Sequence, residues 1–199
     1  MKKLHPLLPL ALLALVFGLA ACGGGDSDED KIVEVIETSA TSADPADCKE
    51  LATQAFLEQT EASEGKAAVE SCEASTEDTS DDPDSVEVTE VEVDGSSASA
   101  NASFSGGSFD GQTLTVGLLE EDGDWKLDEV TGFAEFDQEK LASSFEDALE
   151  SEDDVPPQLA TCVVETIREL PKGEAEQLVI GGSSDPVIEI IEGCSEGLE

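Results

Sequence analysis

This 199-residue sequence contains five cysteines. Their chemistry depends more on the surroundings than that of its other side chains. Cys22 follows a segment that begins with Lys2 and Lys3 and continues as an apolar run over residues 7–21. A basic start, a short apolar run and small residues before a cleavage site are typical of a secretory signal peptide. The run is also short for a membrane span. We therefore expect residues 1–21 to be removed on export.

The end of this segment resembles a known processing motif. Leu19-Ala20-Ala21-Cys22 is similar to the lipobox of bacterial lipoproteins. The resemblance implies that Cys22 receives a diacylglyceryl group, with acyl chains such as palmitate, and anchors the chain in the cell membrane, facing outside the cytoplasm. An ordinary secretory signal that ends near a cysteine is the alternative. The glycines after Cys22 favour the lipobox, with residues 22–29 as the lipidated cysteine and a flexible tether.

The other four cysteines, Cys48, Cys72, Cys162 and Cys194, form an even set in a chain that we expect to be exported. Such a set is typical of disulfide bonds, although four cysteines allow three pairings. We predict Cys48–Cys72 and Cys162–Cys194, because each pair falls within one block of the sequence. The sequence contains no C-x-x-C motif, so a redox role has no support.

The exported part of the chain has no histidine or tyrosine, because His5 lies in the signal segment. A Ser-His-Asp triad, a Cys-His pair and a histidine-ligated zinc site are therefore excluded. Asp128 and Glu129 are the nearest candidates for carboxylate-only catalysis, but we interpret them as surface charges and expect no catalytic residue. The acidic stretch 78–84 fails the EF-hand template, because Pro83 stands where glycine is required. We expect no metal and no cofactor.

The charge of the chain excludes two classes of partner. The formal net charge is −39, and removal of the two lysines in residues 1–21 makes it −41. Nucleic acids and anionic lipid surfaces are bound through clustered Lys and Arg, which this chain lacks. We therefore expect no nucleic-acid partner and attachment to the membrane only through the lipid on Cys22.

The segment after the tether is expected to be helical. Ile32 and Ile36 share one helical face, although the β-branched residues there leave a strand possible. A second helix should begin near Pro45 and continue through Phe56, and a third should cover 66–72.

A β-meander should follow over residues 85–133. Asp94-Gly95 and Asp122-Gly123 predict tight turns between its strands. Four valines in the first strand change from one face to the other part-way along, which predicts a bulge or bend near Thr89-Glu90.

The order of these elements resembles a known superfamily. The resemblance is carried by Cys48…Leu51-Ala-Thr-Gln-Ala-Phe56-Leu57…Cys72 and by Glu121-Asp122-Gly123-Asp124-Trp125-Lys126-Leu127. Both are similar to the nuclear-transport-factor-two-like (ketosteroid-isomerase-like) cone, specifically to small actinobacterial lipoproteins of that superfamily. The resemblance implies an α+β fold over residues 30–135, with helices packed on a curved antiparallel sheet that often leaves a pocket. Some members are isomerases, hydrolases or dehydratases, and many others only bind.

Residues 136–199 form a separate block with helical periodicity. Asp137 can cap a helix, Pro156-Pro157 can open another, and Asp185-Pro186 can open the last. So few residues bury a small core, which the predicted Cys162–Cys194 bond would support. We therefore expect a small disulfide-stapled helical domain.

These observations favour a non-catalytic, lipid-anchored protein that binds a small apolar or amphipathic ligand or an envelope protein. A spacer or interaction module with a solid core is the alternative, and a carboxylate-dependent isomerase or hydrolase is another. Ligand binding predicts an apolar cavity. Its expected lining is Ala98, Ala100, Ala102, Phe104, Leu114, Val116, Trp125 and Leu127.

Overall fold

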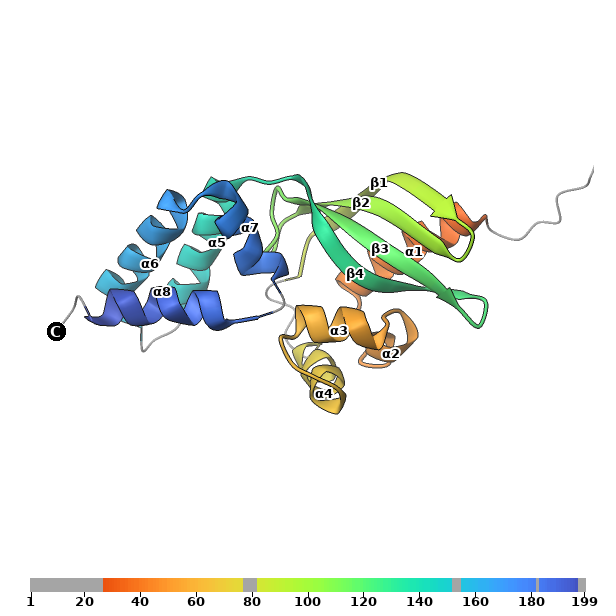
Figure 1. Ribbon diagram of the computed structural model, residues 1–199, viewed down its shortest axis with the longest axis horizontal. Helices are drawn as coiled ribbons and strands as arrows, with labels where there is room; N and C mark the ends of the chain where they lie inside the picture. Colours follow the sequence, from red (N-terminus) through yellow and green to blue (C-terminus); the bar gives the residue numbers. More distant parts are fainter. Residues whose placement is uncertain (1–26, 77–81, 152–154, 182, 197–199) are drawn as a thin grey trace, which may run out of the picture.

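The computed structural model describes residues 27–76, 82–151, 155–181 and 183–196. Within these ranges the chain is an α+β protein with a four-stranded antiparallel sheet. The first lobe contains α1 (Asp28–Thr41), α2 (Asp47–Glu50), α3 (Gln54–Thr60), α4 (Lys66–Ser75), β1 (Ser85–Asp94), β2 (Ser97–Ser105), β3 (Thr113–Glu121) and β4 (Asp124–Glu135). The second contains α5 (Gln138–Ser151), α6 (Pro157–Glu169), α7 (Lys172–Ile180) and α8 (Asp185–Glu196). The two lobes lie side by side along the long axis of the molecule (Figure 1).

Helix α1 begins at Asp28, inside the segment that we expected to be a tether. Ser27 caps it, because its Oγ accepts a hydrogen bond from the Asp30 backbone N–H while its own N–H donates to the Asp30 carboxylate. This is a capping box, which satisfies two backbone donors at the helix start. Cys22 and residues 23–26 lie outside the described residues.

The sheet has the predicted meander order, β1-β2-β3-β4. Both predicted tight turns are present, with positive φ at Gly95 (66°), Asp122 (56°) and Gly123 (97°). The predicted irregularity in β1 is confirmed: the register with β2 shifts between Thr89 and Glu92, and Glu90 has φ 51°.

Strand β4 ends at Glu135, two residues past the predicted end of the meander at residue 133, and it contains three further irregularities. Its pairing with β3 shifts at three places, and each time β4 contributes one residue more than β3. Extra residues of this kind bend a strand and increase its twist. The bent β4 continues to Glu135 and leads directly to the second lobe.

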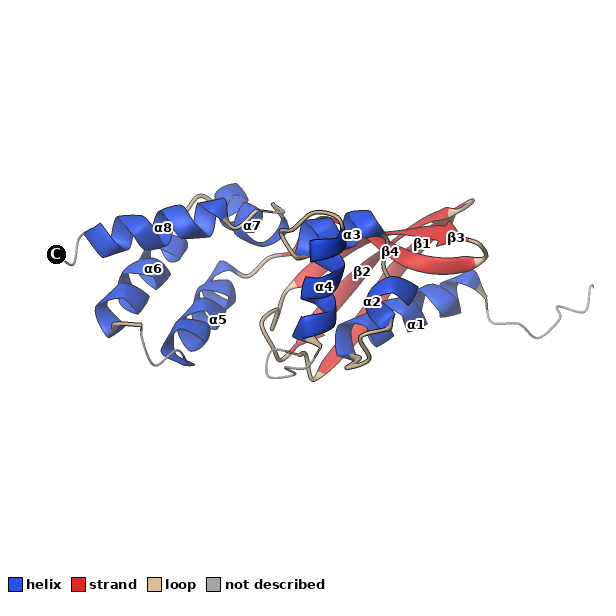
Figure 2. Cartoon of the chain, turned by 90° about the horizontal axis from the view of Figure 1, so that it is seen from below, coloured by secondary structure: helices blue, strands red, loops and turns tan. Residues whose placement is uncertain are grey.

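Helices α1 and α3 pack against one face of the sheet (Figure 2). Ile32 and Ile36 of α1 are almost fully buried there, and Phe56 of α3 packs against the same cluster. The buried members of this core are Ile32, Ile36, Ala100, Ala102, Leu114, Val116, Leu118, Trp125 and Leu127.

The single helix expected from Pro45 through Phe56 is wrong, because two helices, α2 and α3, occupy that segment. The chain between them pairs with β4: Leu127 N–H donates to Leu51 O (2.8 Å), and Thr53 N–H donates to Leu127 O (2.8 Å). These bonds hold the backbone extended where a continuous helix would need it coiled. Thr53 then caps α3, its Oγ1 accepting from Phe56 N–H.

Both predicted disulfides are present. Cys48–Cys72 joins α2 to α4, and Cys162–Cys194 joins α6 to α8, with Cα–Cα distances of 6.1 and 5.7 Å. Each bond closes a loop within one lobe.

The second lobe is helical, as predicted, and Asp137 caps α5 by accepting from the N–H groups of Glu139 and Lys140. Its core is formed mainly by α5, α6 and α8, around Leu141, Val163 and Ile167. In the part of the chain described, no helix is both long and apolar enough to cross a membrane.

Candidate functional site

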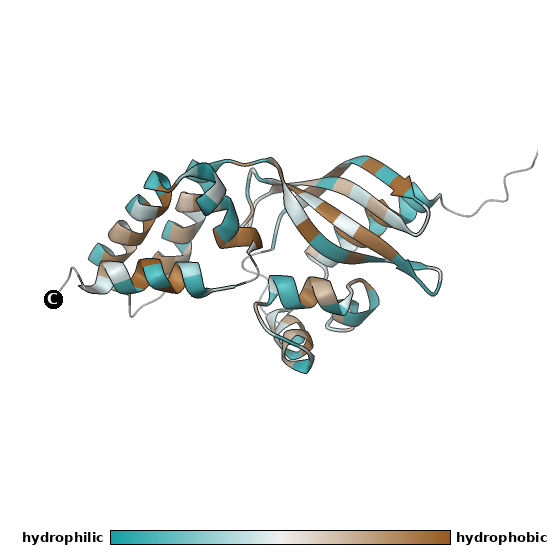
Figure 3. Ribbon diagram, in the orientation of Figure 1, coloured by the Kyte–Doolittle hydropathy of each residue, from teal (hydrophilic) through white to brown (hydrophobic). Residues whose placement is uncertain are grey.

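A pocket of about 360 Å³ lies between the sheet, α1, α3 and the end of α7. Most of its wall is apolar, and the end of α7 that faces the sheet is hydrophobic (Figure 3). The apolar lining residues are Ile36, Ala40, Phe56, Ala102, Phe104, Phe109, Leu114, Val116, Leu127, Val130, Val179 and Ile180. Ser39, Gln59, Thr60 and Glu61 are the polar ones. The pocket therefore lies on the sheet face where the sequence placed a cavity.

Five of the eight residues expected to line a cavity border this pocket. They are Ala102, Phe104, Leu114, Val116 and Leu127. They gather because the inward-facing residues of β2, β3 and β4 lie across from one another in the sheet, as in Ala102↔Leu114.

Ala98, Ala100 and Trp125 do not line the pocket. Ala100 and Trp125 are buried in the core beside Ile32, and Ala98 packs against the same cluster. Trp125 Nε1 lies 3.5 Å from a carboxylate oxygen of Asp28, at the start of α1. The α1 side chains pack against the sheet at this end of the face, and the apolar pocket lies toward the other end.

Sequence reasoning predicted Leu127 of β4 but missed Val130 of the same strand, the residues from α1 and α3, and the end of α7. Simple alternation from Leu127 would place residue 129 on the inner face of the sheet. Val130 faces inward instead, because one of the β4 irregularities lies between Leu127 and residue 129. Val179 and Ile180 come from the second lobe, which we had treated as separate. Only the three-dimensional contact between the lobes identifies them.

Gln59 holds the two lobes together at the pocket wall. Its Oε1 accepts from the Val130 backbone N–H (2.8 Å), and its Nε2 donates to Val130 O (2.9 Å) and Ile180 O (3.2 Å). The side chain thus imitates a backbone hydrogen-bonding pair. The end of α7 is fixed against the pocket as a result.

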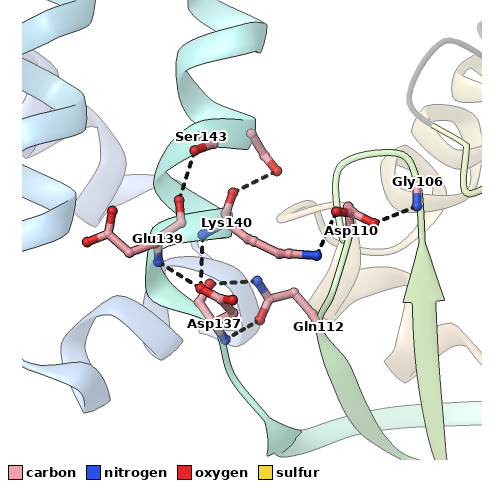
Figure 4. Close-up of polar contacts among 8 residues, drawn as sticks. Gly106, Asp110, Gln112, Asp137, Glu139, Lys140 and Ser143 are labelled. Carbon is pink, nitrogen blue, oxygen red and sulfur yellow. Dashed lines mark hydrogen bonds and ion pairs between the residues drawn. The ribbon is translucent and has the colours of Figure 1, made fainter.

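A second glutamine joins the lobes at the start of α5 (Figure 4). Gln112, only 2% exposed, donates to Asp137 O (2.8 Å) and accepts from Asp137 N–H (2.9 Å). Beside it, Lys140 Nζ lies 2.9 Å from Asp110. The Gly106 backbone N–H and then Lys140 hold the pKa of the Asp110 carboxyl below its usual value.

The polar side chains of the pocket gather where α1 and α3 end. Glu61 Oε2 accepts from Ser71 Oγ (2.7 Å), and Thr60 Oγ1 donates to Phe56 O (3.0 Å). Ser39, from the last turns of α1, lines the pocket at the same end. The site is therefore an apolar chamber with a carboxylate at one end.

Asp128 and Glu129, the carboxylates considered for catalysis, do not line this pocket. Asp128 instead accepts a hydrogen bond from Thr53 Oγ1 (2.8 Å), which fixes the start of α3 on β4. The hydrogen bond of Asp128 is therefore a structural contact between α3 and β4.

A larger hollow of about 590 Å³ lies in the second lobe, between α6, α7 and α8. It borders the Cys162–Cys194 bond, and its wall mixes Leu170 and Ile190 with Glu174 and Glu189. The pocket on the sheet is the better candidate site, because its wall is mainly apolar with few polar groups, as is usual for small-molecule sites.

Comparisons of the chain with protein-family models, with curated proteins and with solved structures find no match. Within the described ranges, no group of three or more His, Cys, Asp or Glu side chains is arranged to hold a metal ion.

Proposed function

We propose that this protein is a lipid-anchored component of the cell envelope that binds a small apolar or amphipathic ligand without catalysis. The fold in this proposal is a cone-like, nuclear-transport-factor-two-like domain followed by a helical domain. The anchor is the diacylglyceryl group on Cys22, as the lipobox resemblance implies. One observation carries the binding proposal: an apolar pocket of about 360 Å³, a volume in the range of small-molecule sites.

The second lobe has a role in this proposal. Val179 and Ile180 form part of the wall, and Gln59 fixes them there. We propose that the helical domain completes the binding site, so that binding needs both lobes.

A fluorescence experiment tests ligand binding. The mature chain, residues 22–199 with Cys22→Ser to prevent lipidation, is titrated with the uncharged apolar fluorophore N-phenyl-1-naphthylamine. Ala40→Phe adds a ring at the pocket wall and should weaken binding about tenfold, because it fills space that the probe would occupy.

Ala55→Phe is the matched control, since Ala55 is exposed and does not line the pocket. It should leave binding within about twofold. An intact fold that binds no probe would contradict the proposal and favour the spacer or interaction module.

A further inference from the structure

A smaller hollow of about 200 Å³ adjoins the polar end of the apolar pocket. The two share the lining residues Ser39, Ala40, Phe56, Thr60 and Glu61. Beyond this boundary the smaller hollow is bordered by three more carboxylates, those of Asp44, Asp47 and Asp82. A molecule that fills the apolar pocket and extends past Glu61 therefore meets four carboxylates.

Three of these carboxylates accept hydrogen bonds from neutral groups. Glu61 accepts from the Ser71 hydroxyl, Asp47 from the Ser42 hydroxyl, and Asp44 from the Ala46 backbone N–H. No Lys or Arg is among the described residues that line either hollow. Within the described part of the chain, no cationic side chain at the site balances their negative charge.

Cations elsewhere on the described surface are already engaged. Each of the seven Lys and Arg side chains there forms an ion pair with a carboxylate. They are Lys31, Lys49, Lys66, Lys126, Lys140, Arg168 and Lys172. An anionic ligand head would therefore find no unpaired Lys or Arg among the described residues, in a chain whose formal net charge is −39.

We infer that the pocket takes a small amphiphile whose head is a protonated amine. Its apolar body fills the chamber on the sheet, and its ammonium group lies among Glu61, Asp44, Asp47 and Asp82. An anionic lipid as long as this amphiphile would place its negative head among the same four carboxylates. Repulsion between like charges disfavours that arrangement. This inference rests on the proposed ligand binding and adds the charge of the ligand head to it.

Three probes of equal chain length test the charge preference: decylamine, decanol and decanoate. Each displaces N-phenyl-1-naphthylamine from the mature chain at pH 7 and physiological salt. Decylamine should compete about tenfold better than decanol, and decanoate should be the weakest, as expected for a hydrogen-bonded ion pair at a half-buried carboxylate.

The outcomes separate the two proposals. Decanoate or decanol competing as well as decylamine would overturn the amine preference while leaving ligand binding intact. Failure of the fluorophore and of all three probes to bind would instead overturn the proposed function itself.

A pair of variants locates the effect at the pocket. Glu61→Gln keeps the hydrogen-bonding shape but removes the charge, so decylamine should lose about tenfold in affinity while decanol changes little. Glu64→Gln removes the same charge from an exposed residue that lines neither hollow, and should change neither probe. Equal losses in the two variants would show only general attraction to an acidic protein and would overturn the inference.

Discussion

Gln59 is the single residue on which the contact between pocket and second lobe depends most directly. Gln59→Leu keeps the size of the side chain but leaves Val130 N–H and Ile180 O without this partner. Loss of such bonds in a half-buried place costs about 1–3 kcal/mol. We expect the free energy of unfolding, measured in urea, to fall by about 2 kcal/mol, and the fluorophore to bind more weakly because α7 is released.

Gln54→Leu is the comparison for that measurement, since Gln54 lies on the same helix but its bonds are exposed. It should change the free energy of unfolding by less than about 0.5 kcal/mol. Equal effects of the two substitutions would mean that Gln59 has no special role.

At the scale of elements, the docking of the β2–β3 loop on α5 should depend on pH through Asp110. Gly106 N–H and Lys140 lower the pKa of this carboxyl in the folded chain, so its ionised form stabilises the fold. That stabilisation is present above the unfolded value near 3.8 and is lost as the pH falls through the lower folded pKa. Carbon NMR titration should find the Asp110 pKa below its usual value, and Lys140→Met should move it upward. An unchanged pKa in Lys140→Met would show that the ion pair does not form in solution.

Local sequence patterns were sufficient for elements whose geometry is set by neighbouring residues. The hairpin at Asp122-Gly123 and the irregularity near Glu90 followed from turn chemistry and from the change of face among the valines. The break between α2 and α3 could not be predicted this way, because the bonds that cause it come from Leu127, far along the chain. The inward position of Val130 could not be predicted from local sequence either, because the β4 irregularity that causes it depends on pairing with β3. Five of the sixteen lining residues were therefore predicted from the sequence, and the others are brought to the pocket by tertiary contacts.

At the scale of the whole molecule, the excess of acids over bases should make the fold sensitive to salt. The sequence has 48 Asp and Glu against 9 Lys and Arg, and the ion pairs of the described residues are exposed or half-exposed. Exposed pairs contribute little, whereas repulsion among the remaining carboxylates opposes the compact state. Raising NaCl from 0.05 to 1 M screens that repulsion and should raise the free energy of unfolding by about 1 kcal/mol, or the melting temperature by about 2–4 °C. Repeating the melt at pH 4 separates screening from general exclusion of salt, because carboxylates that are protonated no longer repel. The gain should shrink there, and a gain of the same size at both pH values would contradict the electrostatic explanation.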